Sequence, residues 1–316
     1  MIPADLFRRV RRLEIRTRGL VDSLFGGRYH TAFKGRGMVF SEVRPYGYAD
    51  DVRAIDWNVS ARTGETHVKV FEEEREQTVL LVVDVSGSTD VGSRERFKRD
   101  VAAEACALLA FSALRNGDRV GLVLFAGGVE HFVPPARTQR HGLRLVRDLY
   151  AWAPGDGRAA GGAAVAPSPP GTDVAGALAF ARRVLRRRAV VVLVSDFVAP
   201  PFARALGALA ARHDVVALHL VDGREGVLPL GVGLLTLTDA ETGERVVVDA
   251  GDERTRAAFA RAAVDRLAGV RTALAAAAVD RVELRPGEDV VPPLARFFEA
   301  RRGARRPART GQRAAA

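Results

Sequence analysis

Residues 78–89 read TVLLVVDVSGST, an apolar run that ends in an aspartate followed by closely spaced hydroxyl residues. Nearly continuous runs of valine and leucine are typical of parallel strands that are buried on both faces of a sheet. Similar runs recur along the chain and are separated by segments with a helical spacing of apolar residues. These runs are Arg119–Phe125, Ala189–Ser195 and Asp214–Leu220. The alternation predicts an α/β fold with a doubly wound, mostly parallel sheet of the Rossmann type.

Weaker patterns predict the elements that surround this sheet. Val129–Val133 follows a Gly-Gly pair and is expected to form an antiparallel edge strand beside the preceding run. A second hairpin is expected around Glu241-Thr242-Gly243, and helical and strand patterns follow it. The bounds predicted for this hairpin and the elements after it are Leu234–Leu237 with Arg245–Val248, Thr255 to about Ala278, Val282–Leu284, and Val291 to about Arg301.

Changes in composition divide the chain into three parts. Residues 1–76 predict an N-terminal extension, with a basic amphipathic helix from Leu6 to Leu24 and then extended segments and turns. Residues 77–300 contain the strand and helix alternation, and residues 301–316 predict a disordered, arginine-rich tail without an acidic residue. The basic helix either packs its apolar side on the body, which we favour, or contacts acidic lipid or nucleic acid.

The composition predicts a cytoplasmic protein without a membrane span. Hydrophobic residues make up 47% of the chain, but no apolar stretch approaches the roughly 20 residues that a membrane-spanning helix needs. The N-terminus also lacks the apolar core of an export signal. Cys106 is the single cysteine, so no internal disulfide can form, and its Ala- and Leu-rich surroundings predict a buried thiol.

Oxygen-bearing side chains cluster where the predicted strands end. Asp84, Ser86 and Ser88 follow the first buried strand, Thr172 precedes a predicted helix, and Asp196 follows a later strand. Because loops at the carboxyl ends of parallel strands meet at one crevice, we expect these five side chains to converge. An oxygen-only set suits Mg²⁺ or Mn²⁺ and does not suit zinc. The alternative is structural: the serines form a turn, and Thr172 or Asp173 caps the following helix.

This set resembles the metal-ion-dependent adhesion site (MIDAS) of von Willebrand factor type A domains. The resemblance rests on Asp84-Val85-Ser86-Gly87-Ser88 after a strand, then Gly171-Thr172-Asp173, then Ser195-Asp196. It implies a type A-like fold in which Ser86, Ser88 and Thr172 touch the ion. The two aspartates would bind it directly or through water. It also implies an open coordination position that favours an acidic group from a protein partner.

A second set of motifs resembles the signature of the domain of unknown function 58 family. Four segments carry it: Gly35–Phe40, Glu42–Tyr46, Asp50–Trp57 and Ser60–Arg62. Val39 and Ala49 depart from the family pattern, which usually has an acid and a glycine there. The resemblance implies a type A-like domain with an N-terminal extension, often encoded beside MoxR-type AAA+ ATPases.

The signature residues also make physical sense by themselves. Arginines and aspartates alternate in it and can form bidentate guanidinium–carboxylate pairs, while aromatic residues supply large anchors. Either the segment braces the extension against the sheet, or it docks a partner, and the sequence favours neither. The residues singled out are Arg44, Tyr46, Asp50, Asp51, Arg53, Asp56, Trp57 and Arg62.

The sequence favours a non-catalytic role. It has no P-loop, no H-E-x-x-H helix and no G-x-S-x-G elbow. Its six histidines are scattered, and none adjoins Ser86. We therefore expect a metal-dependent protein-binding module, an adaptor for a MoxR-type AAA+ ATPase in complex assembly or chaperone-like maturation. The alternatives are a metal-dependent hydrolase, or a binder of nucleic acid or acidic surfaces that uses the basic tail of a chain of net charge +10.

Overall fold

The computed structural model describes residues 39–47, 50–72, 76–90, 92–93, 96–152 and 171–304. Phe33–Gln77 form one compact unit, and the described residues from Thr78 onward belong to a second, larger unit. The predicted N-terminal helix lies outside the described residues. So does the segment 153–170, which is rich in Gly, Ala and Pro.

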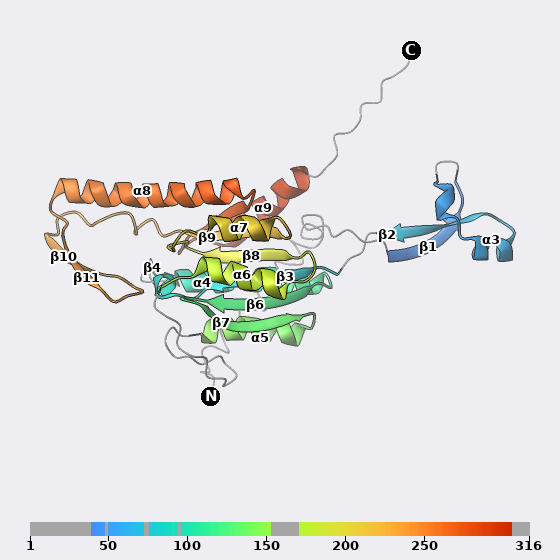
Figure 1. The fold of residues 1–316 in the computed structure, drawn as a ribbon, viewed down its shortest axis with the longest axis horizontal. Coiled ribbons are helices and arrows are strands. Elements are labelled where there is room, and N and C mark those ends of the chain that lie inside the picture. The colour runs from blue at the N-terminus through green and yellow to red at the C-terminus, as the bar shows by residue number, and fades with distance from the viewer. Residues whose placement is uncertain are drawn as a thin grey trace, which may run out of the picture. The chain divides into compact units, whose positions relative to one another are not determined.

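The larger unit is built on a six-stranded sheet with the order β12-β9-β8-β3-β6-β7 (Figure 1). The first five strands run parallel to one another, and β7 pairs antiparallel with β6 at the edge. The strands are β3 Thr78–Asp84, β6 Arg119–Phe125, β7 Val129–Ala136, β8 Val190–Ser195, β9 Asp214–Leu220 and β12 Asp280–Leu284. This confirms the predicted α/β class, because the four Val/Leu runs form the four central strands.

Helices cover both faces of this sheet. The helices α4 and α5 pack against each other, as do α6 and α7, and α8 contacts both α7 and β12. One core joins the inward sides of α6, α7 and the end of α8 to alternate residues of the central strands, including Leu80, Val82 and Leu193. The helices are α4 Lys98–Arg115, α5 Gln139–Ala151, α6 Val174–Val184, α7 Ala203–Ala210, α8 Glu253–Ala276 and α9 Val291–Ala304.

The second predicted hairpin is present as an arm outside the main sheet. Its strands, β10 Leu234–Thr238 and β11 Arg245–Asp249, pair only with each other and lead into α8. Figure 1 shows this arm beside the end of the larger unit that carries β4 and α4. Two short pieces, β4 Gly92–Ser93 and β5 Arg96–Phe97, pair just before α4, and a 3₁₀ turn, η3, spans Gly87–Asp90.

The smaller unit contains the paired strands β1 Val39–Pro45 and β2 His67–Glu72. A 3₁₀ turn, η2 Val52–Ala54, and a short helix, α3 Trp57–Thr63, lie between them. The sequence predicts only extended segments and turns here, so α3 is a correction. Asp56 starts α3 by accepting hydrogen bonds from the backbone amides of Asn58 and Val59, and Gly64 ends it in a left-handed conformation.

The last helix extends past the start predicted for the disordered tail. Helix α9 continues to Ala304, and Arg301 donates hydrogen bonds to the carboxylates of Asp214 and Asp280. Arg301 therefore belongs to the folded body, and this part of the prediction is wrong. Residues 305–316 lie outside the described residues. Within the part of the chain that the structure describes, every helix is too short or too polar to cross a membrane.

The thiol of Cys106 should be chemically silent in the native protein. It lies inside α4, and burial raises its pKa to about 12, so almost no thiolate exists at pH 8. We expect no reaction with Ellman's reagent under native conditions and one equivalent of released chromophore after unfolding in guanidinium. A fast reaction of the native protein would contradict the packing of α4 described here.

Candidate metal centre

The crevice for the site lies between β3 and β8. These strands are parallel neighbours, and the connections that follow them run in opposite directions along the sheet. β3 leads through α4 to β6 on one side, and β8 leads through α7 to β9 on the other. The loops that leave their carboxyl ends therefore diverge, which opens a crevice at the switch point of a doubly wound sheet. Asp84 is the last residue of β3 and Ser195 the last of β8.

Asp84 is buried at the centre of a group of hydroxyls. Its Oδ1 accepts hydrogen bonds from the backbone amide of Ser86 at 3.0 Å and from the Ser86 hydroxyl at 2.6 Å. Its Oδ2 accepts one from the Ser195 hydroxyl at 2.6 Å. The Ser86 and Ser88 oxygens lie 3.1 Å apart. The structure thus brings three of the predicted residues, Asp84, Ser86 and Ser88, into direct contact.

The charge of Asp84 is poorly compensated by the protein alone. Burial, helped by the nearby negative charge of Asp196, raises the pKa of Asp84 to about 7, although hydrogen bonds from Ser195 and Ser86 oppose the rise. Two buried carboxylates near one another are unfavourable unless a cation accompanies them. The electrostatics of this crevice therefore favour a bound positive charge.

Asp196 lies beside this group and is held by a buried lysine. Its Oδ2 accepts a hydrogen bond from the Lys98 ammonium at 2.8 Å, and its Oδ1 accepts from the amide of Val198 at 3.1 Å. Lys98 also pairs with Glu225, and its side chain is fully buried. Burial alone would lower the pKa of Lys98, but the two carboxylates outweigh it and the net shift is upward. Lys98 thus stays charged.

The backbone after Asp196 is strained in a way that fixes this loop. Phe197 has a φ of 58°, a left-handed conformation that costs energy for a residue with a side chain. Its amide donates to the Ser195 hydroxyl at 2.8 Å, and its ring packs against Phe202 and His219. These contacts hold Asp196 and Ser195 at the crevice.

Thr172 reaches the same end of the sheet from the start of α6. The backbone amide of Asp173 donates to the carbonyl of Ala126, just beyond β6, at 2.7 Å, and Asp173 caps α6 through Gly176. The capping role considered for Asp173 is therefore present. Thr172 instead donates its hydroxyl to the carboxylate of Glu241, at the tip of the β10–β11 hairpin.

The hairpin tip also touches the loop that follows β3. The carbonyl oxygen of Ala240 approaches Gly87 so closely that a Cβ atom at this position would clash with it. Glycine is therefore required between the two serines for the tip to approach. The tip, through Ala240 and Glu241, thus contacts both the Ser86–Ser88 turn and the Thr172 loop.

The donor chemistry fits a hard divalent ion. The candidate set offers three uncharged hydroxyls and two carboxylates, all oxygen, as Mg²⁺ prefers. Among the described residues, no group of three or more histidine, cysteine or acidic side chains is arranged to hold a metal. A metal here would therefore depend on the hydroxyls of Ser86, Ser88 and Thr172. Asp84 and Asp196 each have both carboxylate oxygens engaged by hydrogen bonds, so contact with an ion through water suits either of them.

Three residues that contribute to this arrangement were not predicted as site residues. Ser195 bonds directly to Asp84, and its place at the end of a buried strand was a usable signal. Glu241 lies in the predicted hairpin turn, but nothing in the sequence connects it to Thr172. Lys98 is one of only three lysines in a chain with 48 lysine and arginine residues, which is a weak signal.

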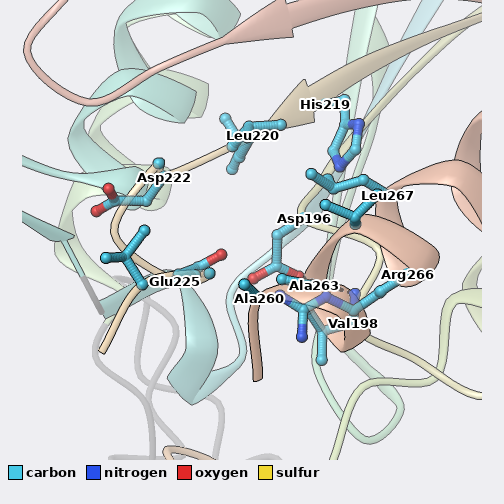
Figure 2. Close-up of a pocket in the computed structure, with 15 residues that line it drawn as sticks. Asp196, Val198, His219, Leu220, Asp222, Glu225, Ala260, Ala263, Arg266 and Leu267 are labelled. Atoms are coloured by element: carbon cyan, nitrogen blue, oxygen red, sulfur yellow. Dashed lines mark hydrogen bonds between the residues drawn. The ribbon is translucent and has the colours of Figure 1, made fainter. Parts of the chain in front are cut away.

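A cavity of about 300 Å³ opens behind Asp196, between the end of β9 and α8. Figure 2 shows Asp196 and Glu225 facing this space, with Arg266 and His219 at its sides. Burial lowers the pKa of His219 to about 4, so the imidazole is neutral at physiological pH. Because Lys98 pairs with both acids, the cavity borders the ion-pair cluster that supports the candidate metal centre.

Comparison with known proteins identifies the family. The model of a family described as "Protein of unknown function DUF58" matches residues 42–268. The chain belongs to the DUF58 family. Uncharacterized DUF58 relatives from Mycobacterium tuberculosis and Mycobacterium bovis are each 36% identical to it over 295 residues, which is 93% of this chain and 89% of theirs.

Solved structures share parts of the architecture. BatB from Bacteroides thetaiotaomicron is 15% identical with a TM-score of 0.46, over 71% of this chain and 98% of its own. The von Willebrand factor type A domain of SpRpn10 is 11% identical with a TM-score of 0.37, over 71% of this chain and 95% of its own.

The DUF58 signature residues lie in the smaller unit. Arg44 forms the predicted bidentate pair with Asp50, with N–O distances of 2.8 and 2.6 Å, and Tyr46 donates to the Asp50 carbonyl. Asp51 and Asp56 also use their carboxylates to cap η2 and α3.

The aromatic anchors of the signature are not buried in this unit. Trp57 is 71% exposed and Tyr46 36% exposed. Arg53 and Arg62 are exposed as well. Whether Trp57 and Tyr46 anchor the unit to the sheet or to a partner stays a prediction.

Proposed function

We propose that this DUF58 protein is a non-catalytic, metal-dependent protein-binding module. Ser86, Ser88 and Thr172 would hold Mg²⁺ or Mn²⁺, with Asp84 and Asp196 acting directly or through water. The observation that supports this most strongly is the buried Asp84 carboxylate, surrounded by three hydroxyls of which two are candidate ligands. When bound, the ion supplies a concentrated positive charge at the crevice. The side chains around the ion would orient it and keep water from its buried side.

The proposed target is an acidic residue on a protein partner. Neutral hydroxyl ligands leave much of the charge of a divalent ion uncompensated, so an additional carboxylate is favoured. The partner class that we propose, by resemblance to the family, is a MoxR-type AAA+ ATPase, with this protein acting as an adaptor in complex assembly. Within the signature unit Trp57 is exposed, and an indole of this kind often anchors an interface.

Metal binding should be visible as thermal stabilisation. A ligand at 100 times its dissociation constant stabilises the native state by about 2.7 kcal/mol. For a domain of this size that corresponds to a rise in Tm of roughly 5–10 °C. We expect MgCl₂ or MnCl₂ to produce such a rise in the wild type, EDTA to reverse it, and Ser86→Ala/Ser88→Ala to abolish it.

Ser112→Ala is the matched control for this experiment. Ser112 is a buried serine of α4 whose hydroxyl bonds to the Leu108 carbonyl, away from the crevice. This variant should keep the full response to metal. The partner is then tested by co-purification of a MoxR-type ATPase in Mg²⁺ and in EDTA. Equal recovery in Mg²⁺, in EDTA and with the double serine variant would contradict metal-mediated capture.

A further inference from the structure

We propose that Glu241 is an intramolecular ligand of the candidate metal centre and occupies the position that an acidic partner residue would take. This rests on the proposed function and adds a device for its regulation. The hairpin tip would occlude the centre until the tip moves away and exposes it. The partner's carboxylate and Glu241 would then compete for the same charge.

The first support is the contact itself. The Glu241 carboxylate accepts the Thr172 hydroxyl, and its other oxygen lies 3.6 Å from where a Cβ atom of Gly171 would be. Thr172 and Glu241 are 69 residues apart in the chain. This contact therefore depends on the tertiary fold and is not a local turn. It places a carboxylate at one of the hydroxyls that the metal would use.

The second support is that the tip is built to present this carboxylate. The side chain of Asp239 accepts hydrogen bonds from the amides of Glu241 and Thr242, both at 2.8 Å. Gly243 closes the turn with a φ of 73°, and its backbone amide donates a hydrogen bond to the Asp239 carbonyl at 2.9 Å. The backbone at Glu241 is thus fixed by its own turn.

The third support is that the arm of the hairpin is weakly attached. Leu234 is 74% exposed and Val247 63% exposed, so the strands bury little apolar surface. Segments with few buried contacts open at low free-energy cost. The tip contacts at Gly87 and Thr172 therefore account for a large share of what holds this arm on the crevice.

The charges are also consistent with an intramolecular carboxylate. Asp84, Asp196, Glu225 and Glu241 carry four negative charges in this region when ionised, and Lys98 and Arg266 supply two positive charges. A divalent ion brings the balance close to neutral.

The test compares Glu241→Ala with Glu244→Ala, an exposed glutamate on the same hairpin, and with Asp239→Ala, which loosens the turn. The first readout is amide hydrogen exchange of residues 236–246 in EDTA. Loss of one partly buried, charge-assisted hydrogen bond should speed exchange about tenfold in Glu241→Ala. We expect Asp239→Ala to do the same and Glu244→Ala to match the wild type.

The second readout uses Mn²⁺ and water proton relaxation. In the wild type, Glu241 should keep one water off the bound ion, and millimolar acetate should change nothing. In Glu241→Ala the relaxation enhancement per bound Mn²⁺ should rise, and acetate should lower it again. Mn²⁺ bound through Ser86 with identical relaxation and acetate response in both proteins would overturn this inference alone. No Mn²⁺ binding by any variant would overturn it together with the proposed function.

Discussion

Replacing Lys98 with methionine is expected to lower the free energy of unfolding by about 3–5 kcal/mol, the cost of leaving buried charges without their partner. Lys98 is fully buried, and its ammonium contacts the carboxylates of Asp196 and Glu225. It is also the first residue of α4, where a cation meets the unfavourable end of the helix dipole. The two ion pairs must therefore stabilise Lys98 by more than its unfavourable interaction with the helix dipole costs.

Urea denaturation in EDTA measures the effect, with Arg204→Met as the control. Arg204 is an exposed basic residue of α7, and its loss should change stability by no more than about 0.5 kcal/mol. The double variant Lys98→Met/Glu225→Gln should lose less than the sum of the single changes, because Gln removes one of the two carboxylates that Lys98→Met leaves without a cation. A loss below about 1 kcal/mol for Lys98→Met would contradict the buried ion-pair cluster.

The central sheet could be predicted from the sequence because burial on both faces leaves a direct mark on composition. The four Val/Leu runs became β3, β6, β8 and β9. The topology then required their carboxyl ends to meet, which is why Asp84, Ser86 and Ser88 were found together beside Asp196. The geometry of parallel sheets therefore predicted that these residues lie together, which no local motif could do.

The residues that were missed act through pairs that lie far apart in the chain. Lys98 and Asp196 are separated by 98 residues, and Ser195 and Asp84 by 111. Sequence periodicity reports which face of an element is buried, but not which polar group it meets there. The hairpin turn at Glu241 was predicted, whereas its contact with Thr172 depends on how the arm folds back.

Local hydrogen bonds account for a feature of the smaller unit that the alternating charges did not predict. Asp51 and Asp56 each accept backbone amides two or three residues ahead as a helix cap. A cap bond closes within one turn and orders little of the chain, whereas an exposed ion pair has a small net value.

Asp84→Ala should cost about 3 kcal/mol or more in EDTA, whereas Asp84→Asn should cost about 1 kcal/mol or less, by the usual penalty for each buried donor left unpaired. The alanine variant leaves the Ser86 amide and the hydroxyls of Ser86 and Ser195 without their acceptor. Asparagine retains an acceptor oxygen and also removes a charge that is costly here, since burial and the negative charge of Asp196 raise the pKa of Asp84 to about 7. Its loss of hydrogen bonds is therefore partly offset.

Both substitutions should abolish the response to Mg²⁺ if Asp84 is part of the metal centre. Urea denaturation of each variant, first in EDTA and then in MgCl₂, separates the structural role of the carboxylate from its charge. If Asp84→Asn still gains stability from Mg²⁺, the ion binds elsewhere and the proposed centre is wrong. If Asp84→Asn is as unstable as Asp84→Ala in EDTA, the negative charge itself holds β3 to its neighbours. In that case Ser86 and Ser195 donate to a carboxylate that is structurally required, whether or not a metal binds.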